Sequence, residues 1–163
     1  MRSKRLIAVA SLVAVAVLST ATAYAVTAST TVTATVPPAI AITVPAAHVL
    51  GVTVGSQVVT DLSIGVKSNT TWNMTVYKDQ DLTTGADVIP SARLVYTSAS
   101  TNGSGIAGNT LFDTSATPTN VVTAGTKTGE AGATTTVNYK LTANYDDNPG
   151  TYSAVHTYTA IAP

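Results

Sequence analysis

Apolar residues recur at every second position through much of this chain, and this spacing restricts the folds that the chain can adopt. After residue 25, no window longer than about ten residues has the spacing of three and four that an amphipathic helix requires. The chain also contains 31 threonines, and this β-branched residue suits a pleated surface with one face in water. We therefore expect an all-β domain: an antiparallel β-sandwich of about seven to nine strands with immunoglobulin-like, Greek-key topology.

The expected strands are short alternating segments bounded by glycine, proline, asparagine or aspartate. They cover residues 26–36, 40–44, 49–54, 58–66, 71–76, 89–97, 134–145 and 151–161. The last two strands flank the sequence Asp-Asp-Asn-Pro-Gly at 146–150, which is a strong turn former. We expect those two strands to form a hairpin, and we expect the polar stretch 98–109 to be a loop.

The first 25 residues have the three parts of a secretion signal. These parts are the basic residues Arg2, Lys4 and Arg5, the apolar run 6–18, and the small residues Ala23 and Ala25 before Val26. A retained membrane helix is the alternative, but an apolar run of about 13 residues is shorter than the roughly 20 that span a bilayer. We expect a signal helix that is cleaved between Ala25 and Val26, which leaves no stable membrane anchor and places the protein outside the cell or on its surface.

The charge of the exported chain argues against nucleic acid as a partner. Removal of residues 1–25 leaves five basic against eight acidic residues, a net charge of −3. The five basic residues are scattered singly and cannot form the patch that follows a phosphate backbone. The chain has no cysteine, so stability must come from sheet pairing and core packing without disulfides.

The segment 26–36 has the strictest alternation in the chain. One face carries Val26, Ala28, Thr30, Val32, Ala34 and Val36, and the other face carries only threonine and serine. Pro37 and Pro38 end the segment, so we divide the exported chain into an extended N-terminal strand, 26–38, and a sandwich domain, 39–163. Two alternatives follow for this strand. It folds back into its own sandwich, or it is donated to the sheet of another molecule.

No residues form a recognisable catalytic or cofactor-binding group, so we expect neither enzymatic activity nor a cofactor. The two histidines, His48 and His156, lie far apart in sequence, and no G-x-S-x-G motif occurs. The best cation candidate is the set Asp79, Asp81 and Asp87, because closely spaced carboxylates suit Ca²⁺. Threonine occupies the position that requires glycine in an EF-hand loop, so a solvated acidic turn is the alternative.

Three N-x-S/T sequons, at Asn69, Asn73 and Asn102, would accept a glycan in a host with the required machinery. The aromatic residues of the expected terminal hairpin, Tyr139, Tyr145, Tyr152 and Tyr158, admit two interpretations. They pack in the core with their apolar neighbours, or they form an exposed platform for carbohydrate.

Three stretches carry a resemblance to a known group of proteins. They are VKSNTTWNMTV at 66–76, VIPSARLVY at 88–96 and VNYKLTANYDDNPGTYSAVHTYTA at 137–160. Together with the N-terminal strand, they resemble bacterial secreted surface domains of the WxL-like type and related donor-strand matrix or pilus subunits. The Trp-x-Leu motifs of that group correspond here to Trp72-Asn73-Met74 and Tyr139-Lys140-Leu141. The resemblance implies an extracellular β-sandwich that assembles at the cell surface.

We therefore expect a structural subunit of an extracellular filament, pilus or surface matrix. Its partner would be another copy of the same chain, joined head to tail through the donated strand, with contacts to the cell envelope or to glycans. One alternative is a monomeric secreted adhesin or a module that binds glycans or cell wall. Another is a subunit similar to type IV pilins, in which the N-terminal helix is retained.

Overall fold

The computed structural model describes residues 26–163. The signal helix, the cleavage site at Ala23 and Ala25, and the retained helix of the pilin-like alternative lie outside the described residues. Residues 36–163 form one compact unit, which is described first. Within the described part of the chain, no helix is long and apolar enough to cross a membrane.

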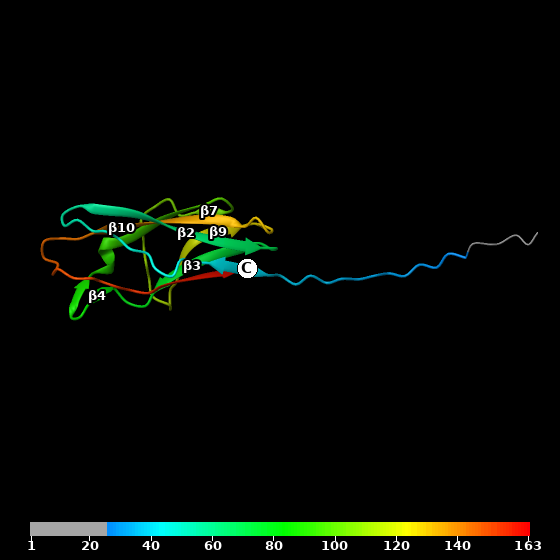
Figure 1. Ribbon diagram of the computed structural model, residues 1–163, viewed down its shortest axis with the longest axis horizontal. Helices are drawn as coiled ribbons and strands as arrows, with labels where there is room; N and C mark the ends of the chain where they lie inside the picture. The colour runs from blue at the N-terminus through cyan, green and yellow to red at the C-terminus, as the bar shows by residue number, and fades with distance from the viewer. Residues whose placement is uncertain (1–25) are drawn as a thin grey trace, which may run out of the picture. The chain divides into compact units, whose positions relative to one another are not determined.

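The compact unit is all-β, and every strand pairing in it is antiparallel. Its strands are β1 (Ile40–Thr43), β2 (Gln57–Ser68), β3 (Trp72–Lys78), β4 (Leu82–Thr84), β5 (Asp87–Ile89), β6 (Leu94–Ser100), β7 (Ser104–Gly105), β8 (Thr110–Leu111), β9 (Thr119–Gly125), β10 (Ala133–Thr142) and β11 (His156–Ile161). A five-stranded sheet has the order β1-β2-β10-β6-β8, and a four-stranded sheet has the order β11-β3-β9-β7. The small β4-β5 hairpin lies at one end of the unit (Figure 1), and a 3₁₀ turn, η1 (Ser91–Arg93), follows it.

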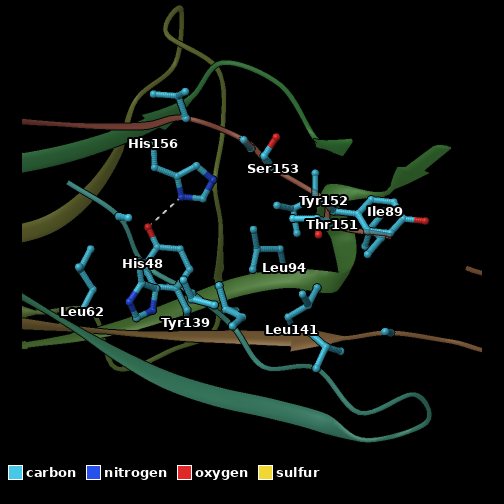
Figure 2. Close-up of a pocket in the computed structure, with 18 of the residues that line it drawn as sticks. His48, Leu62, Ile89, Leu94, Tyr139, Leu141, Thr151, Tyr152, Ser153 and His156 are labelled. Atoms are coloured by element: carbon cyan, nitrogen blue, oxygen red, sulfur yellow. Dashed lines mark hydrogen bonds between the residues drawn. The ribbon is translucent and has the colours of Figure 1, made fainter. Parts of the chain in front are cut away.

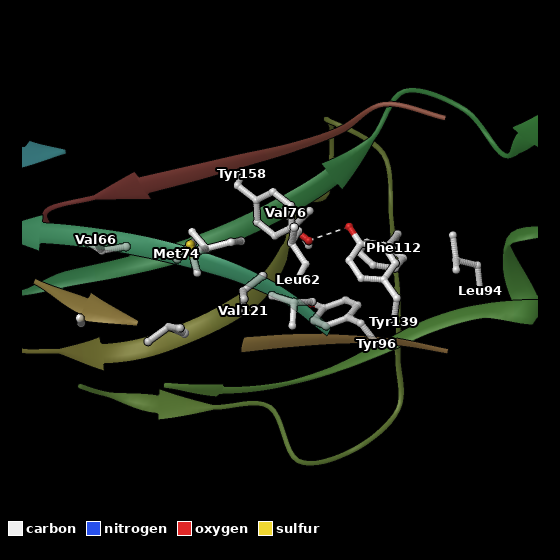
Figure 3. Packing of buried hydrophobic residues seen from close by; sticks show 14 of the residues in the cluster. Leu62, Val66, Met74, Val76, Leu94, Tyr96, Phe112, Val121, Tyr139 and Tyr158 are labelled. Carbon is white, nitrogen blue, oxygen red and sulfur yellow. Dashed lines mark hydrogen bonds between the residues drawn. The ribbon is translucent and has the colours of Figure 1, made fainter. Parts of the chain in front are cut away.

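One hydrophobic core lies between the two sheets, as their alternating patterns require. The five-stranded sheet contributes every second residue of β2, β6 and β10, and the four-stranded sheet contributes those of β3 together with residues of β9 and β11. Figure 3 shows these side chains meeting between the strands. Trp72, Ile64 and Val137 are fully buried, and burial of one large apolar side chain stabilises the fold by about 1.5–3 kcal/mol. The strand predictions at 40–44, 58–66, 71–76 and 134–145 are confirmed by β1, β2, β3 and β10, and β11 lies within the predicted strand 151–161.

The predicted terminal hairpin is wrong. Strand β10 lies between β2 and β6 in one sheet, whereas β11 pairs with β3 in the other. The apolar faces of β10 and β11 meet across the core, where the hydroxyl groups of Tyr139 and Tyr158 are 2.7 Å apart. Alternation identifies the face that a strand buries, but it does not identify the neighbouring strand.

Two further strand predictions and one loop prediction need correction. Residues 49–54 form no strand. The predicted strand 89–97 is divided by Pro90 and the turn η1, and the predicted loop 98–109 contains the end of β6 and the short β7. Strand β9 was not predicted, because a register shift against β3 places the neighbours Val121 and Val122 both in the core. Such a β-bulge interrupts the alternation that reveals a strand.

The predicted N-terminal strand is in no sheet that the described residues form. Residues 26–39 are all exposed and belong to no strand, and the first strand begins at Ile40. The valines of the apolar face are 92%, 87% and 77% exposed at Val26, Val32 and Val36. The segment therefore retains an apolar face that the described chain does not bury.

Trp72 and Gly125 make a close contact in the core. Trp72 Nε1 donates a hydrogen bond to the carbonyl of Thr126 at 2.9 Å, and a Cβ added to Gly125 would overlap the indole ring. We expect Gly125→Ala to lower the free energy of unfolding by about 1–3 kcal/mol, the usual cost of overpacking. Gly108→Ala is the matched control, because nothing lies within 4 Å of a Cβ there. Equal urea midpoints for the two variants would contradict this account of the contact.

Candidate functional site: an apolar groove beside β2

The long strand β2 is paired along only part of one edge. Strand β10 pairs with residues 57–66, but β1 pairs only with residues 65–68 on the opposite edge. Among the described residues, no strand pairs with that edge over residues 57–64. Backbone groups on an open edge are a template for another strand.

The open edge results from the early end of β1. Pro45 follows β1 closely, and proline can neither donate a ladder hydrogen bond nor continue a paired strand easily. The chain from 44 to 54, which we call the cover segment, then runs to Gly55 without entering a sheet. At Gly55, which has a φ of 79°, the chain turns and its amide donates to the carbonyl of Ala143 at 2.8 Å.

The cover segment is held to the sandwich by side-chain contacts. His48 Nε2 is 2.9 Å from the hydroxyl oxygen of Thr60 on β2, and its ring packs against Tyr139 with centroids 4.9 Å apart. Val44 and Leu50 pack against the core while remaining partly exposed. Val49 is 82% exposed. The segment therefore lies near the open edge without the continuous hydrogen bonds of a strand.

The segment 147–156 forms the opposite wall, and polar contacts hold it. The guanidinium of Arg93 donates two hydrogen bonds to the carboxylate of Asp147, at 2.7 and 2.6 Å, and this pairing lowers the pKa of Asp147 below its usual value. Thr83 and Ser153 exchange backbone hydrogen bonds at 3.1 and 2.9 Å. The carboxylate of Asp79 accepts a further bond from the amide of Val155 at 2.8 Å.

A groove of about 800 Å³ lies between these walls, and more of its lining is apolar than polar. Its floor is formed by the core residues Leu62 of β2, Leu94 of β6, and Tyr139 and Leu141 of β10. Figure 2 shows the side chains of His48, Tyr139 and His156 at one end of the groove and those of Ile89 and Tyr152 at the other. The groove therefore reaches the hydrophobic core from outside, along the side of the sandwich where β2 is unpaired.

A buried polar cluster forms one end of the groove. The hydroxyl of Tyr139 is 2.8 Å from Nδ1 of His156 and 2.7 Å from the hydroxyl of Tyr158. Burial raises the pKa of both tyrosines and lowers the pKa of His156 to about 4. All three groups are thus neutral near pH 7, and a chain of bonds from Tyr158 through Tyr139 to a neutral imidazole satisfies them. The ring of Phe112 packs against His156 with centroids 4.1 Å apart.

The three aspartates of the predicted cation site do not converge on one point. Asp79 bonds the amide of Val155, Asp81 pairs with Lys78, and Asp87 accepts a bond from the Asn148 side chain. Across residues 26–163, no group of three or more histidine, aspartate or glutamate side chains is placed to hold a metal ion. Asp79 and Asp87 instead hold the segment 147–156, and Asp81 pairs with a lysine of its own turn.

The three sequon asparagines use their side chains in structural hydrogen bonds. Asn69 holds the chain before β1, Asn73 accepts a bond from the amide of Ala124, and Asn102 bonds Thr126. The amide nitrogens of Asn69 and Asn102, to which a glycan would be attached, already donate to the carbonyl of Pro37 and to the hydroxyl of Thr126, respectively.

The tyrosines predicted to share one hairpin are dispersed. Tyr139 and Tyr158 are buried in the core, Tyr152 is partly buried beside the groove, and Tyr145 is 90% exposed. They form no common exposed platform among the described residues. Sequence reasoning missed the groove itself, because it assigned residues 49–54 to a strand, whereas in the structure they form no strand and line the groove.

Comparison with known proteins adds no relative. No protein-family model matches the chain, and no match was found among curated proteins or solved structures.

Proposed function

We propose that this protein is a structural subunit of an extracellular filament, pilus or surface matrix, and that it polymerises by donating residues 26–36 to the next subunit. One observation carries the proposal: a strictly alternating, uncharged segment lies outside every strand of the described chain, with its valines exposed. Such a segment gains backbone hydrogen bonds and buries its apolar face when it is added to the edge of another sheet.

The sandwich has features that suit this role. An open edge at β2 and an adjoining apolar groove are the two elements that strand addition needs. The connections from β2 to β3 and from β10 to β11 pass from one sheet to the other, which supports an immunoglobulin-like, Greek-key sandwich as the finer description of the fold. The resemblance to donor-strand surface subunits points in the same direction.

The proposal includes export and the absence of catalysis. Removal of residues 1–25 would make Val26 the N-terminus and release the donor segment outside the membrane. The buried His156, Tyr139 and Tyr158 would serve the core and the groove, where hydrogen bonds join their polar groups to one another.

A monomeric binding module is the second candidate, and the groove favours it. A space of about 800 Å³ lined by both apolar and polar side chains is also typical of small-ligand sites. Glycans or envelope components would be the ligands of such a module.

Electron microscopy and sedimentation of residues 26–163 distinguish the two candidates. We expect fibres whose mass increases with protein concentration above a threshold. A strictly monomeric protein at every concentration would contradict the structural role and favour the binding module.

A further inference from the structure

We infer that the acceptor for the donated strand is the open edge of β2 at residues 57–64 together with the apolar groove, and that the cover segment 44–54 is a placeholder which the strand of a second copy displaces. This inference rests on the proposed function. It specifies the surface that receives the strand and the part of the chain that must move.

The length of the open edge fits the donor. The edge spans residues 57–64, and the donor spans residues 26–36. At about 3.3 Å per residue, the donor is long enough to pair with the whole edge and to retain a few residues as a link to its own sandwich.

The chemistry of the two faces also fits. The apolar face of the donor carries valine, alanine and one threonine, with no charge, and it would meet the apolar floor formed by residues such as Leu62 and Leu141. The other face carries threonine and serine. It would continue the polar outer face of the five-stranded sheet, where Asp61 and Ser63 of β2 are exposed.

The cover segment is suited to displacement. Its backbone forms no ladder with residues 57–64, and its side-chain bond to that edge is the contact between His48 and Thr60. Val49, Val52 and Val54 remain 82%, 38% and 42% exposed. A donor strand would replace these side-chain contacts with a continuous set of backbone hydrogen bonds.

The donor must come from a second copy, because residues 37–39 are held at the end of β2 that lies away from the open edge. Asn69 donates to the carbonyl of Pro37 at 2.9 Å and accepts from the amide of Ala39 at 2.8 Å, which fixes this part of the chain beside the Ser68 end of β2. The open edge occupies the opposite end of β2, and β1 covers the edge between them. The donor segment therefore leaves the sandwich at one end of β2, and the next copy accepts it at the other end of its own β2. Repetition of this contact gives an open, head-to-tail polymer.

Disulfide trapping tests the position of the donor, and the chain offers no competing cysteine. Val59→Cys places a thiol on the outer face of the open edge, where Val59 is 52% exposed. This variant is mixed with chains that carry a single cysteine at position 27, 29, 31, 33 or 35, and fibres are confirmed by microscopy before oxidation. Thr159→Cys, on the exposed face of β11 at the edge of the other sheet, is the matched control.

We expect a disulfide between Val59→Cys and one or two of the donor positions, and none with Thr159→Cys. Fibres that cross-link through Thr159→Cys, or that fail to cross-link through Val59→Cys with every donor position, would overturn the assigned edge while leaving the proposed function intact. A mixture that forms no fibres when the unmodified chain also forms none would contradict the proposed function, and the inference with it.

Hydrogen exchange of the unmodified chain tests the role of the cover segment. Between monomer and fibre, we expect alternate amides of residues 57–64 to exchange at least about tenfold more slowly, while amides of the cover segment gain no protection. Increased protection of the cover segment, with unchanged exchange at 57–64, would overturn the displacement.

Discussion

Replacement of Val32 by aspartate is expected to abolish fibre assembly without weakening the sandwich. Val32 is 87% exposed in the described chain, so the substitution removes no core contact. In the assembled state the carboxylate would enter an apolar groove, and the burial of an unpaired charge costs several kcal/mol. We expect the threshold concentration for assembly to rise at least about a hundredfold, which corresponds to about 2.7 kcal/mol, as measured by sedimentation.

Thr31→Asp is the matched control for this substitution. It introduces the same charge one residue away, on the opposite face of the donor strand. A charge on that face stays in solvent, so we expect a change in the threshold of less than about tenfold. Equal loss of assembly in both variants would show that charge alone, and not the apolar face, determines the effect.

Acid is expected to destabilise the sandwich through His156. The pKa of this histidine is lowered from its ordinary value of 6.5 to about 4, chiefly by burial. The charge of Asp79 opposes this shift, whereas Lys78 and His48 add to it. The unfolded chain therefore binds a proton that the folded chain excludes. Through this histidine, the free energy of unfolding falls as the pH decreases from about 6.5 towards 4, by about 3 kcal/mol in total. Above about pH 6.5 the histidine causes no loss.

Urea unfolding between pH 6.5 and 4.5 isolates this effect. The carboxylates of Asp81, Asp113 and Asp147 have lowered pKa values, so the stability that they contribute is lost mainly below this range. We expect His156→Gln to lose most of the pH dependence. His48→Gln should retain most of it, although burial also lowers the pKa of His48. If His156→Gln keeps the full dependence, the buried imidazole is not its source.

The sequence allowed individual strands to be predicted, but not the way in which the strands pair. Alternation correctly marked β2 and β10, because each buries one face against the core. It did not place β11 beside β3, since strand pairing depends on contacts between distant parts of the chain that a local pattern does not contain. It also missed β9, where the bulge that buries Val121 and Val122 together disrupts the pattern.

The candidate site was predictable only on the donor side. The alternation of 26–36 is a local property that the sequence displays directly. The acceptor side arises from the early end of β1 and from two loops that leave the core accessible. An unpaired edge leaves no pattern in the sequence. The sequence also gives no sign that His48 and His156, which are far apart along the chain, line the same groove.

Chain termination in mixed assemblies tests the central claim most directly. A Val32→Asp chain keeps its acceptor groove but is not expected to donate its strand, so it should bind to a growing end and stop further addition. Microscopy of mixtures with the unmodified protein should show a mean fibre length that falls as the fraction of Val32→Asp increases, whereas Thr31→Asp should leave the length unchanged. Incorporation of Val32→Asp along fibres of undiminished length would contradict assembly by donation of residues 26–36.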